Sequence, residues 1–65
     1  MYDVELDNGT KVVSCGSYGS VAQAVAECWL MAEAIPVARK AAYRVYNGST
    51  LVASLWSNGY VWQVA

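Results

Sequence analysis

The longest periodic stretch of the chain runs from Ser20 to Ile35, and its hydrophobic residues recur with the spacing of a helix. One arc of this helix is apolar and predicts the face that packs on the core: Val21, Ala24, Val25, Cys28, Met31, Ala32 and Ile35, with Trp29 at its border. Ser20 and Gln23 form a capping-box pattern that predicts the helix start. Pro36 predicts its end, because a proline disfavours helical backbone in the residue before it. Leu30 lies on the polar side, where a leucine indicates more protein or a contact surface.

Alternating apolar and acidic residues from Tyr2 to Leu6 predict a strand. Asn8-Gly9 then predicts a two-residue turn that places Asp7 opposite Thr10 and leads into a second strand, up to Cys15. We expect the apolar pairs of this hairpin to face the core: Val4 with Val13 and Tyr2 with Cys15. The pairs expected on the other side are Asp3 with Ser14 and Glu5 with Val12.

The chain beyond the helix predicts a three-stranded meander, with sequences YRVY, TLVASLW and YVWQV separated by Asn47-Gly48-Ser49 and by Asn58-Gly59. Leu51, Ala53 and Leu55 are expected on the helix side, joined by Tyr43 and Val45 if the first of these loops holds three residues. A two-residue turn at Asn58-Gly59 pairs Leu55 with Trp62, Ala53 with Val64, Trp56 with Val61 and Ser54 with Gln63. Residues 36–42 fit either a short second helix or a loop, and we expect a loop or single turn.

The order of elements is therefore ββαβββ. It predicts one α+β domain over residues 1–65, with an antiparallel sheet of four or five strands and one helix packed on one face. The order of the strands stays open, because the helical connection lets the first hairpin lie beside the last strands in more than one way.

Composition narrows the class of protein. The chain has 65 residues, of which 57% are hydrophobic and 14% charged, so it suits one folded domain rather than a disordered segment. Its apolar runs are far shorter than the roughly 20 residues of a membrane span. The N-terminus lacks the basic and apolar regions of a signal peptide, so we expect a cytoplasmic protein and no membrane association. Cys15 and Cys28 are expected to be reduced core residues rather than metal ligands.

The sequence offers little for catalysis. It contains no histidine, which removes the usual activated nucleophiles and the commonest metal ligand. Asp3 and Glu5 share a predicted strand face, a spacing that a carboxylate pair could use, but a solubilising outer face is the better explanation. Gly16-Ser17-Tyr18-Gly19 lacks the lysine of a phosphate-binding loop. We therefore predict no enzyme activity and no cofactor or metal.

The sheet side away from the helix is unusually apolar for a solvent-facing surface. Its expected members are Arg44, Tyr46, Thr50, Val52, Ser54, Trp56 and Val61. Curvature that covers Trp56 with the chain's own loop, a homodimer seam, and a docking surface for another molecule each explain this pattern. We predict a protein-binding surface there, with Leu30 as a second patch; its residues are Trp56, Tyr46, Arg44, Val61, Val52 and Leu30.

Nucleic-acid binding is the second class considered. Residues 1–33 hold five acidic residues and one lysine, a sum of −4, and the rest of the chain holds three cations, Arg39, Lys40 and Arg44, a sum of +3. These cations lie near Tyr46 and Trp56, as in surfaces that stack bases and grip phosphates. The net charge of −1 argues against a nonspecific binder of this kind.

The segments GSVAQAVAECW and NGSTLVASLWSNGYVWQV form a helix followed by strands with Asn-Gly turns and a final aromatic-rich strand. This layout resembles small phage and mobile-element proteins of ββαβββ type, including anti-CRISPR inhibitors of type I systems. The resemblance implies a stoichiometric inhibitor that binds a bacterial defence complex in the host cytoplasm.

Overall fold

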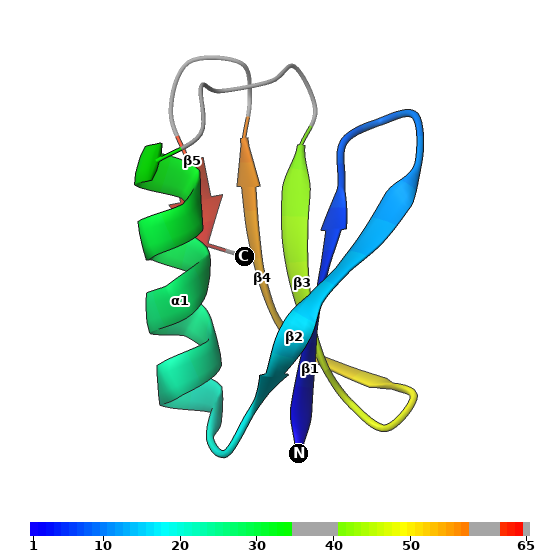
Figure 1. Ribbon diagram of the computed structural model, residues 1–65, viewed down its shortest axis with the longest axis vertical. Helices are drawn as coiled ribbons and strands as arrows, with labels where there is room; N and C mark the ends of the chain where they lie inside the picture. The colour runs from blue at the N-terminus through cyan, green and yellow to red at the C-terminus, as the bar shows by residue number, and fades with distance from the viewer. Residues whose placement is uncertain (35–40, 58–61, 65) are drawn as a thin grey trace.

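The computed structural model describes residues 1–34, 41–57 and 62–64 of the chain. The elements in chain order are β1 (Tyr2–Asp7), β2 (Val12–Tyr18), α1 (Val21–Ala34), β3 (Ala42–Asn47), β4 (Thr50–Ser57) and β5 (Trp62–Val64). All five strands pair antiparallel in one sheet, and α1 packs on one face of it (Figure 1). The predicted α+β fold with ββαβββ order is confirmed.

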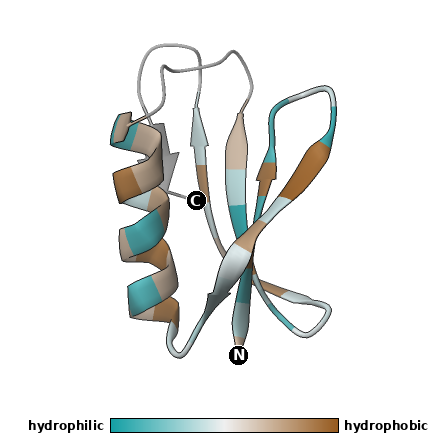
Figure 2. Cartoon of the chain, in the orientation of Figure 1, coloured by the Kyte–Doolittle hydropathy of each residue, from teal (hydrophilic) through white to brown (hydrophobic). Residues whose placement is uncertain are grey.

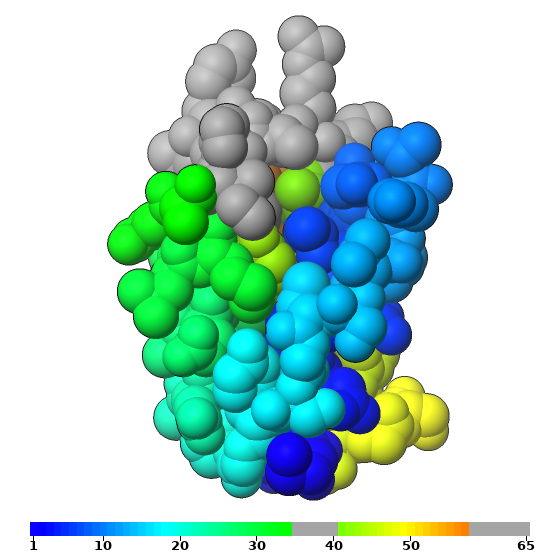
Figure 3. Space-filling model, in the orientation of Figure 1, coloured from blue at the N-terminus to red at the C-terminus, as the bar shows by residue number. Residues whose placement is uncertain are grey.

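The strand order that the sequence left open is β2-β1-β3-β4-β5. The first hairpin joins the meander through β1 and β3, so that β1 lies inside the sheet and β2 at its edge. The sheet is strongly twisted, and β2 crosses in front of β1 and β3 before it leads into the helix (Figure 1). β2 and α1 consequently contact each other on the same side of the molecule (Figure 3).

The core lies between α1 and the sheet. The helix contributes only small buried side chains, those of Ala24, Cys28 and Ala32. The strands contribute the larger ones: Val4, Tyr43, Val45 and Leu55. Small residues on the helix let its backbone approach the sheet closely, so that a short chain can fill its core. None of the described helices is long and apolar enough to span a membrane.

The helix starts where its sequence predicts. The Ser20 hydroxyl oxygen accepts a hydrogen bond from the Gln23 backbone N–H at 3.1 Å, as an N-cap residue does. Within the expected apolar arc, Val21, Val25 and Met31 are half-buried around the three buried residues, and Ile35 lies outside the described residues. The predictions for the Pro36 stop and for residues 36–40 also fall outside the described residues.

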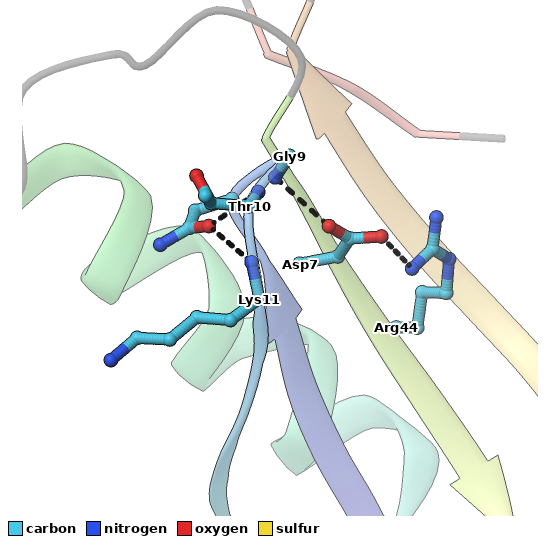
Figure 4. A network of polar contacts seen from close by, with 6 residues as sticks. Asp7, Gly9, Thr10, Lys11 and Arg44 are labelled. Atoms are coloured by element: carbon cyan, nitrogen blue, oxygen red, sulfur yellow. Dashed lines mark hydrogen bonds and ion pairs between the residues drawn. The ribbon is translucent and has the colours of Figure 1, made fainter.

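The register predicted for the first hairpin is wrong, because the turn lies one residue further along. Its central residues are Gly9 and Thr10, and the Asn8 N–H donates to the Lys11 carbonyl oxygen at 3.2 Å. The Asn8 side-chain oxygen accepts hydrogen bonds from the N–H groups of Thr10 and Lys11 at 2.9 and 3.0 Å. This local bonding holds Asn8 before the turn instead of within it. Figure 4 shows the two hydrogen bonds that the N–H groups of Thr10 and Lys11 donate.

Asp7 therefore pairs with Val12, and the register shifts again further along β2. Ser14 pairs with Glu5 and Gly16 with Val4, which leaves Cys15 as the extra residue of a β-bulge. The pairs Val4 with Val13, Tyr2 with Cys15, Asp3 with Ser14 and Glu5 with Val12 are consequently wrong; Tyr2 pairs with Tyr18 and Asp3 with Ser17. β2 thus continues to Tyr18, three residues beyond the predicted strand end at Cys15.

A second bulge lies in β4. A two-residue turn at Gly48 and Ser49 pairs Asn47 with Thr50, and the ladder then skips Val52. Ala53 and Leu55 lie on the helix side as expected. Tyr43 and Val45 lie there too, although the loop holds two residues and not the three on which their placement depended, because the bulge shifts the register. Leu51 does not, because the bulge pairs it with Tyr46 on the opposite face, where its side chain is 52% exposed.

The pairing predicted for the last hairpin is displaced by two residues. β4 pairs Leu55 with Val64, Trp56 with Gln63 and Ser57 with Trp62. The Asn58-Gly59 turn and Val61, the predicted neighbour of Trp56, lie outside the described residues.

Both cysteines are free thiols that contact the core cluster. Burial, and to a smaller extent the neighbouring Cys15, raise the pKa of the Cys28 thiol to about 11. Cys28 is therefore protonated at neutral pH and serves as a small apolar core residue.

Candidate functional site

The candidate site is the sheet face opposite α1, which we call the outer face. The strand register determines its members, because side chains alternate between the two faces. They are Asp3, Glu5 and Asp7 on β1, Arg44 and Tyr46 on β3, and Leu51, Val52, Ser54 and Trp56 on β4. β3 lies between the acidic residues of β1 and the apolar residues of β4.

An apolar cluster occupies one end of the outer face. Tyr46 and Leu51 are directly paired, and alternation from Ala53 brings Val52 to the same side. Leu51 and Val52 are 52% and 40% exposed, and Tyr46 is half-buried. These three residues form what we call the Tyr46 cluster. The bulge creates it by turning two consecutive apolar side chains of β4 toward solvent.

Trp56 lies on the same face but apart from the Tyr46 cluster. It is half-buried and pairs with Ala42, four positions along β3 from Tyr46, or about 13 Å at the usual strand rise. The pair Arg44 and Ser54 separates the two. The outer face thus carries the Tyr46 cluster at one end and Trp56 at the other, with the polar pair Arg44 and Ser54 between them.

Carboxylates line the other side of the outer face. Glu5 lies directly opposite Arg44, and Asp3 lies opposite Tyr46. The Arg44 guanidinium forms an ion pair with the Asp7 carboxylate at 3.0 Å, as Figure 4 shows. The Ser17 hydroxyl donates a hydrogen bond to the Asp3 carboxylate. Arg44 is the only basic residue within the described strands, so this face has three carboxylates and one cation, a sum of −2.

Two neighbours hold the pKa of the Asp7 carboxyl below its ordinary value of 3.8. The larger effect comes from the Gly9 backbone N–H, which donates to Oδ1 at 2.9 Å, and the second from Arg44 on Oδ2. Both interactions favour the charged form. Asp7 therefore links the hairpin turn to β3 through its two oxygens.

This geometry predicts a pH dependence. Because the Asp7 pKa is lower in the folded chain than in the unfolded chain, its stabilising contribution is present above pH 3.8 and lost as the pH falls through the folded pKa. We expect Arg44→Gln to raise the Asp7 pKa toward 3.8 without reaching it, because the Gly9 bond remains. Carboxyl NMR titration measures this, with Lys11→Gln as a control that leaves the value unchanged. An Asp7 pKa at or above 3.8 in the original chain would contradict the assignment.

The structure places four of the six predicted site residues on the outer face, though Trp56 lies apart from the others: Arg44, Tyr46, Val52 and Trp56. Leu30 is 59% exposed on α1, which covers the other sheet face, so it belongs to a separate surface. Val61, Arg39 and Lys40 lie outside the described residues. Sequence reasoning missed Leu51, which no turn signal marks as part of a bulge. It also missed the acidic margin of the outer face, formed by Asp3, Glu5 and Asp7, because this margin depends on the pairing of β1 with β3.

Both carboxylates of the pair considered from the sequence lie beside other polar side chains. Asp3 and Glu5 share the outer face as expected, but Ser17 bonds the first and Arg44 faces the second. In the described part of the chain, no three side chains of His, Cys, Asp or Glu gather as metal ligands would. No family model, curated protein or solved structure matches the chain.

Proposed function

We propose that the protein is a non-catalytic binding module that docks on another protein through its outer face. One observation carries this proposal: α1 covers only one side of the sheet, and the other side bears the exposed Tyr46 cluster and Trp56. An antiparallel sheet with one solvated face normally carries polar residues there. Tyr, Trp and Arg are also the residues that contribute most to binding at protein interfaces.

The cost of the exposed residues supports this proposal. Full burial of a leucine or valine side chain is worth about 1.5 to 3 kcal/mol, and Leu51 and Val52 forgo much of that in the isolated chain. The total stability of a domain is only about 5 to 15 kcal/mol. A partner that covers the Tyr46 cluster would recover this free energy on binding.

The charge of the outer face indicates the chemistry of the partner. Its sum of −2 favours a protein surface with an apolar centre and a basic margin. The same charge disfavours nucleic acid, because Arg44 is already paired with Asp7 and lies opposite Glu5. The resemblance in layout to phage inhibitors makes CRISPR interference complexes of type I systems the first partners to test.

The proposal predicts which variants lose binding. We expect a purified type I interference complex to bind the original chain and the Leu30→Gln variant equally. The affinity of the Tyr46→Ser, Val52→Ser double variant should fall at least about 10-fold. A loss of about 1.4 kcal/mol of apolar contact is enough to lower the affinity 10-fold. Isothermal titration measures both affinities, and circular dichroism confirms that each variant is folded.

Capture from a bacterial lysate extends the test to other partners. A protein retained by the original chain and by Leu30→Gln but lost from the double variant supports docking through the outer face. If the double variant keeps every partner, the proposal is wrong. If the retained material is nucleic acid that nuclease removes, the second class of function replaces it.

A further inference from the structure

The second feature with functional consequences is the free edge of β2. This strand is at the end of the sheet, and the sequence Val12–Tyr18 contains no charged residue and no proline. Val12 and Val13 are 55% and 40% exposed although they project to opposite faces. Figure 2 shows this apolar stretch beside the hairpin loop. Edge strands are normally protected by charges, prolines or bulges, and here the bulge begins only after Ser14.

The ladder between β1 and β2 shows which backbone groups point to the free edge. The Asn8 N–H bond to the Lys11 carbonyl marks a hydrogen-bonded pair, and such pairs alternate with non-bonded ones along an antiparallel ladder. Leu6 with Val13 is therefore the next bonded pair. The N–H and C=O groups of Val12 and Ser14 point away from β1, toward the open edge.

We propose that this edge binds the same edge of a second copy of the chain, antiparallel about a twofold axis at Val13. In this register Val12 of each copy lies opposite Ser14 of the other, and their outward groups form four hydrogen bonds. The two Val13 residues then form a non-bonded pair, with Cα atoms about 4.5 Å apart and side chains in contact. The two five-stranded sheets become one.

A second copy suits this edge better than a charged peptide for two reasons. The segment is uncharged, so a twofold axis brings no like charges opposite each other. The nearest carboxylates, those of Glu5 and Asp7, lie one strand further in. Glu5 of one copy and Asp7 of the other are about 14 Å apart and are largely screened at physiological salt. Val13 is the exposed valine on the helix side, and in the dimer each Val13 is covered by Val13 of the other copy.

Four hydrogen bonds and one valine pair form a small interface, below the roughly 800 Å² per partner of a stable complex. We therefore expect a weak dimer whose population rises with concentration. In this dimer both outer faces lie on the same side of the joined sheet. The inference does not rest on the proposed function, because it concerns the edge of the sheet and not the outer face.

Sedimentation equilibrium on the purified chain, combined with amide hydrogen exchange, tests the proposal. We expect mass to increase toward that of a dimer with concentration. The Val12 and Ser14 amides should exchange rapidly in dilute samples and at least several-fold more slowly in concentrated ones, whereas the Val13 amide should be protected in both. A chain that stays monomeric at millimolar concentration would overturn the proposal. So would a dimer in which the Val12 and Ser14 amides exchange at the dilute rate.

Two matched variants locate the contact. Val12→Lys places a charge beside the seam, and we expect it to weaken dimerisation about 10-fold, since like charges in adjacent strands destabilise pairing. Leu51→Lys introduces the same charge at an equally exposed site on β4 and should leave dimerisation unchanged. If only Leu51→Lys dissociates the dimer, the outer face and not β2 is the seam, and the proposal fails.

Discussion

Leu55→Ala is expected to destabilise the protein by about 2 to 5 kcal/mol, the usual cost of emptying a leucine site in a core. Leu55 is only 2% exposed, lies opposite Tyr43 and belongs to the core cluster under the helix. At roughly 0.05 to 0.15 kcal/mol per residue, a chain of 65 residues is stable by about 3 to 10 kcal/mol, so the variant should lose a large share of its stability. Urea unfolding followed by tryptophan fluorescence measures the loss.

Leu51→Ala is the matched control, since it is the same change in the same strand. Its side chain is 52% exposed on the outer face, so we expect a change within about 0.5 kcal/mol, as for most surface substitutions. The comparison tests the β4 bulge directly. In a regular strand both leucines would face the helix, and the two variants would then be destabilised alike, which would contradict the register described.

Gly16→Ala is the second substitution with a large expected effect. Gly16 has a φ of 121°, a backbone conformation that side chains rarely adopt, and holding a residue there costs about 1 to 3 kcal/mol. An added Cβ would also lie 3.5 Å from the Tyr18 hydroxyl oxygen, an ordinary contact. The expected loss of stability therefore comes from backbone strain at the β2 bulge rather than from crowding.

Gly19→Ala provides the control three residues further along. Gly19 has no such backbone conformation, and the nearest atom to an added Cβ, in the Gln23 side chain, is 3.9 Å away. We expect this variant to be neutral or slightly stabilised, because alanine restricts the unfolded chain. Thermal unfolding of the two variants side by side gives the answer. Equal stability would mean that Gly16 does not hold the bulge.

The sequence predicts the elements of this fold well because each has a local cause. The helix start follows from Ser20, whose hydroxyl caps the Gln23 N–H. The buried arc of Ala24, Cys28 and Ala32 follows from helical periodicity. The predicted hairpin turn lies one residue too early, because the Asn8 side chain accepts hydrogen bonds from the backbone of Thr10 and Lys11.

Strand register is harder to predict, because the β4 bulge has no local signal and the β2 bulge is marked only by Gly16, which also fits a loop. Cys15 and Val52 are ordinary strand residues, yet each is the extra residue of its ladder. A bulge is selected by how the whole sheet twists onto the helix, and single-strand patterns do not carry that information. The outer face could therefore be predicted in part: Tyr46 and Trp56 follow from alternation, whereas Leu51 depends on the bulge.

The sequence alone also does not predict the acidic margin of the outer face. Asp7 and Arg44 are far apart in the chain, and they meet only because β1 pairs with β3. Because the sequence leaves the strand order open, it predicts neither the ion pair nor the net charge of the face. The pairing of β1 with β3 brings carboxylates beside Arg44, and the resulting negative charge is why we propose a basic protein and not nucleic acid as the partner.

Site-specific photo-crosslinking in bacterial cells tests the central claim, that the outer face is the docking surface, most directly. A benzophenone side chain replaces Val52 on the outer face, Leu30 on the helix, or the exposed Ala22 as a background control. We expect a discrete crosslinked protein from position 52, lost when Tyr46→Ser is added, and only background from positions 30 and 22. A partner that crosslinks from position 30 but not from position 52 would contradict the claim.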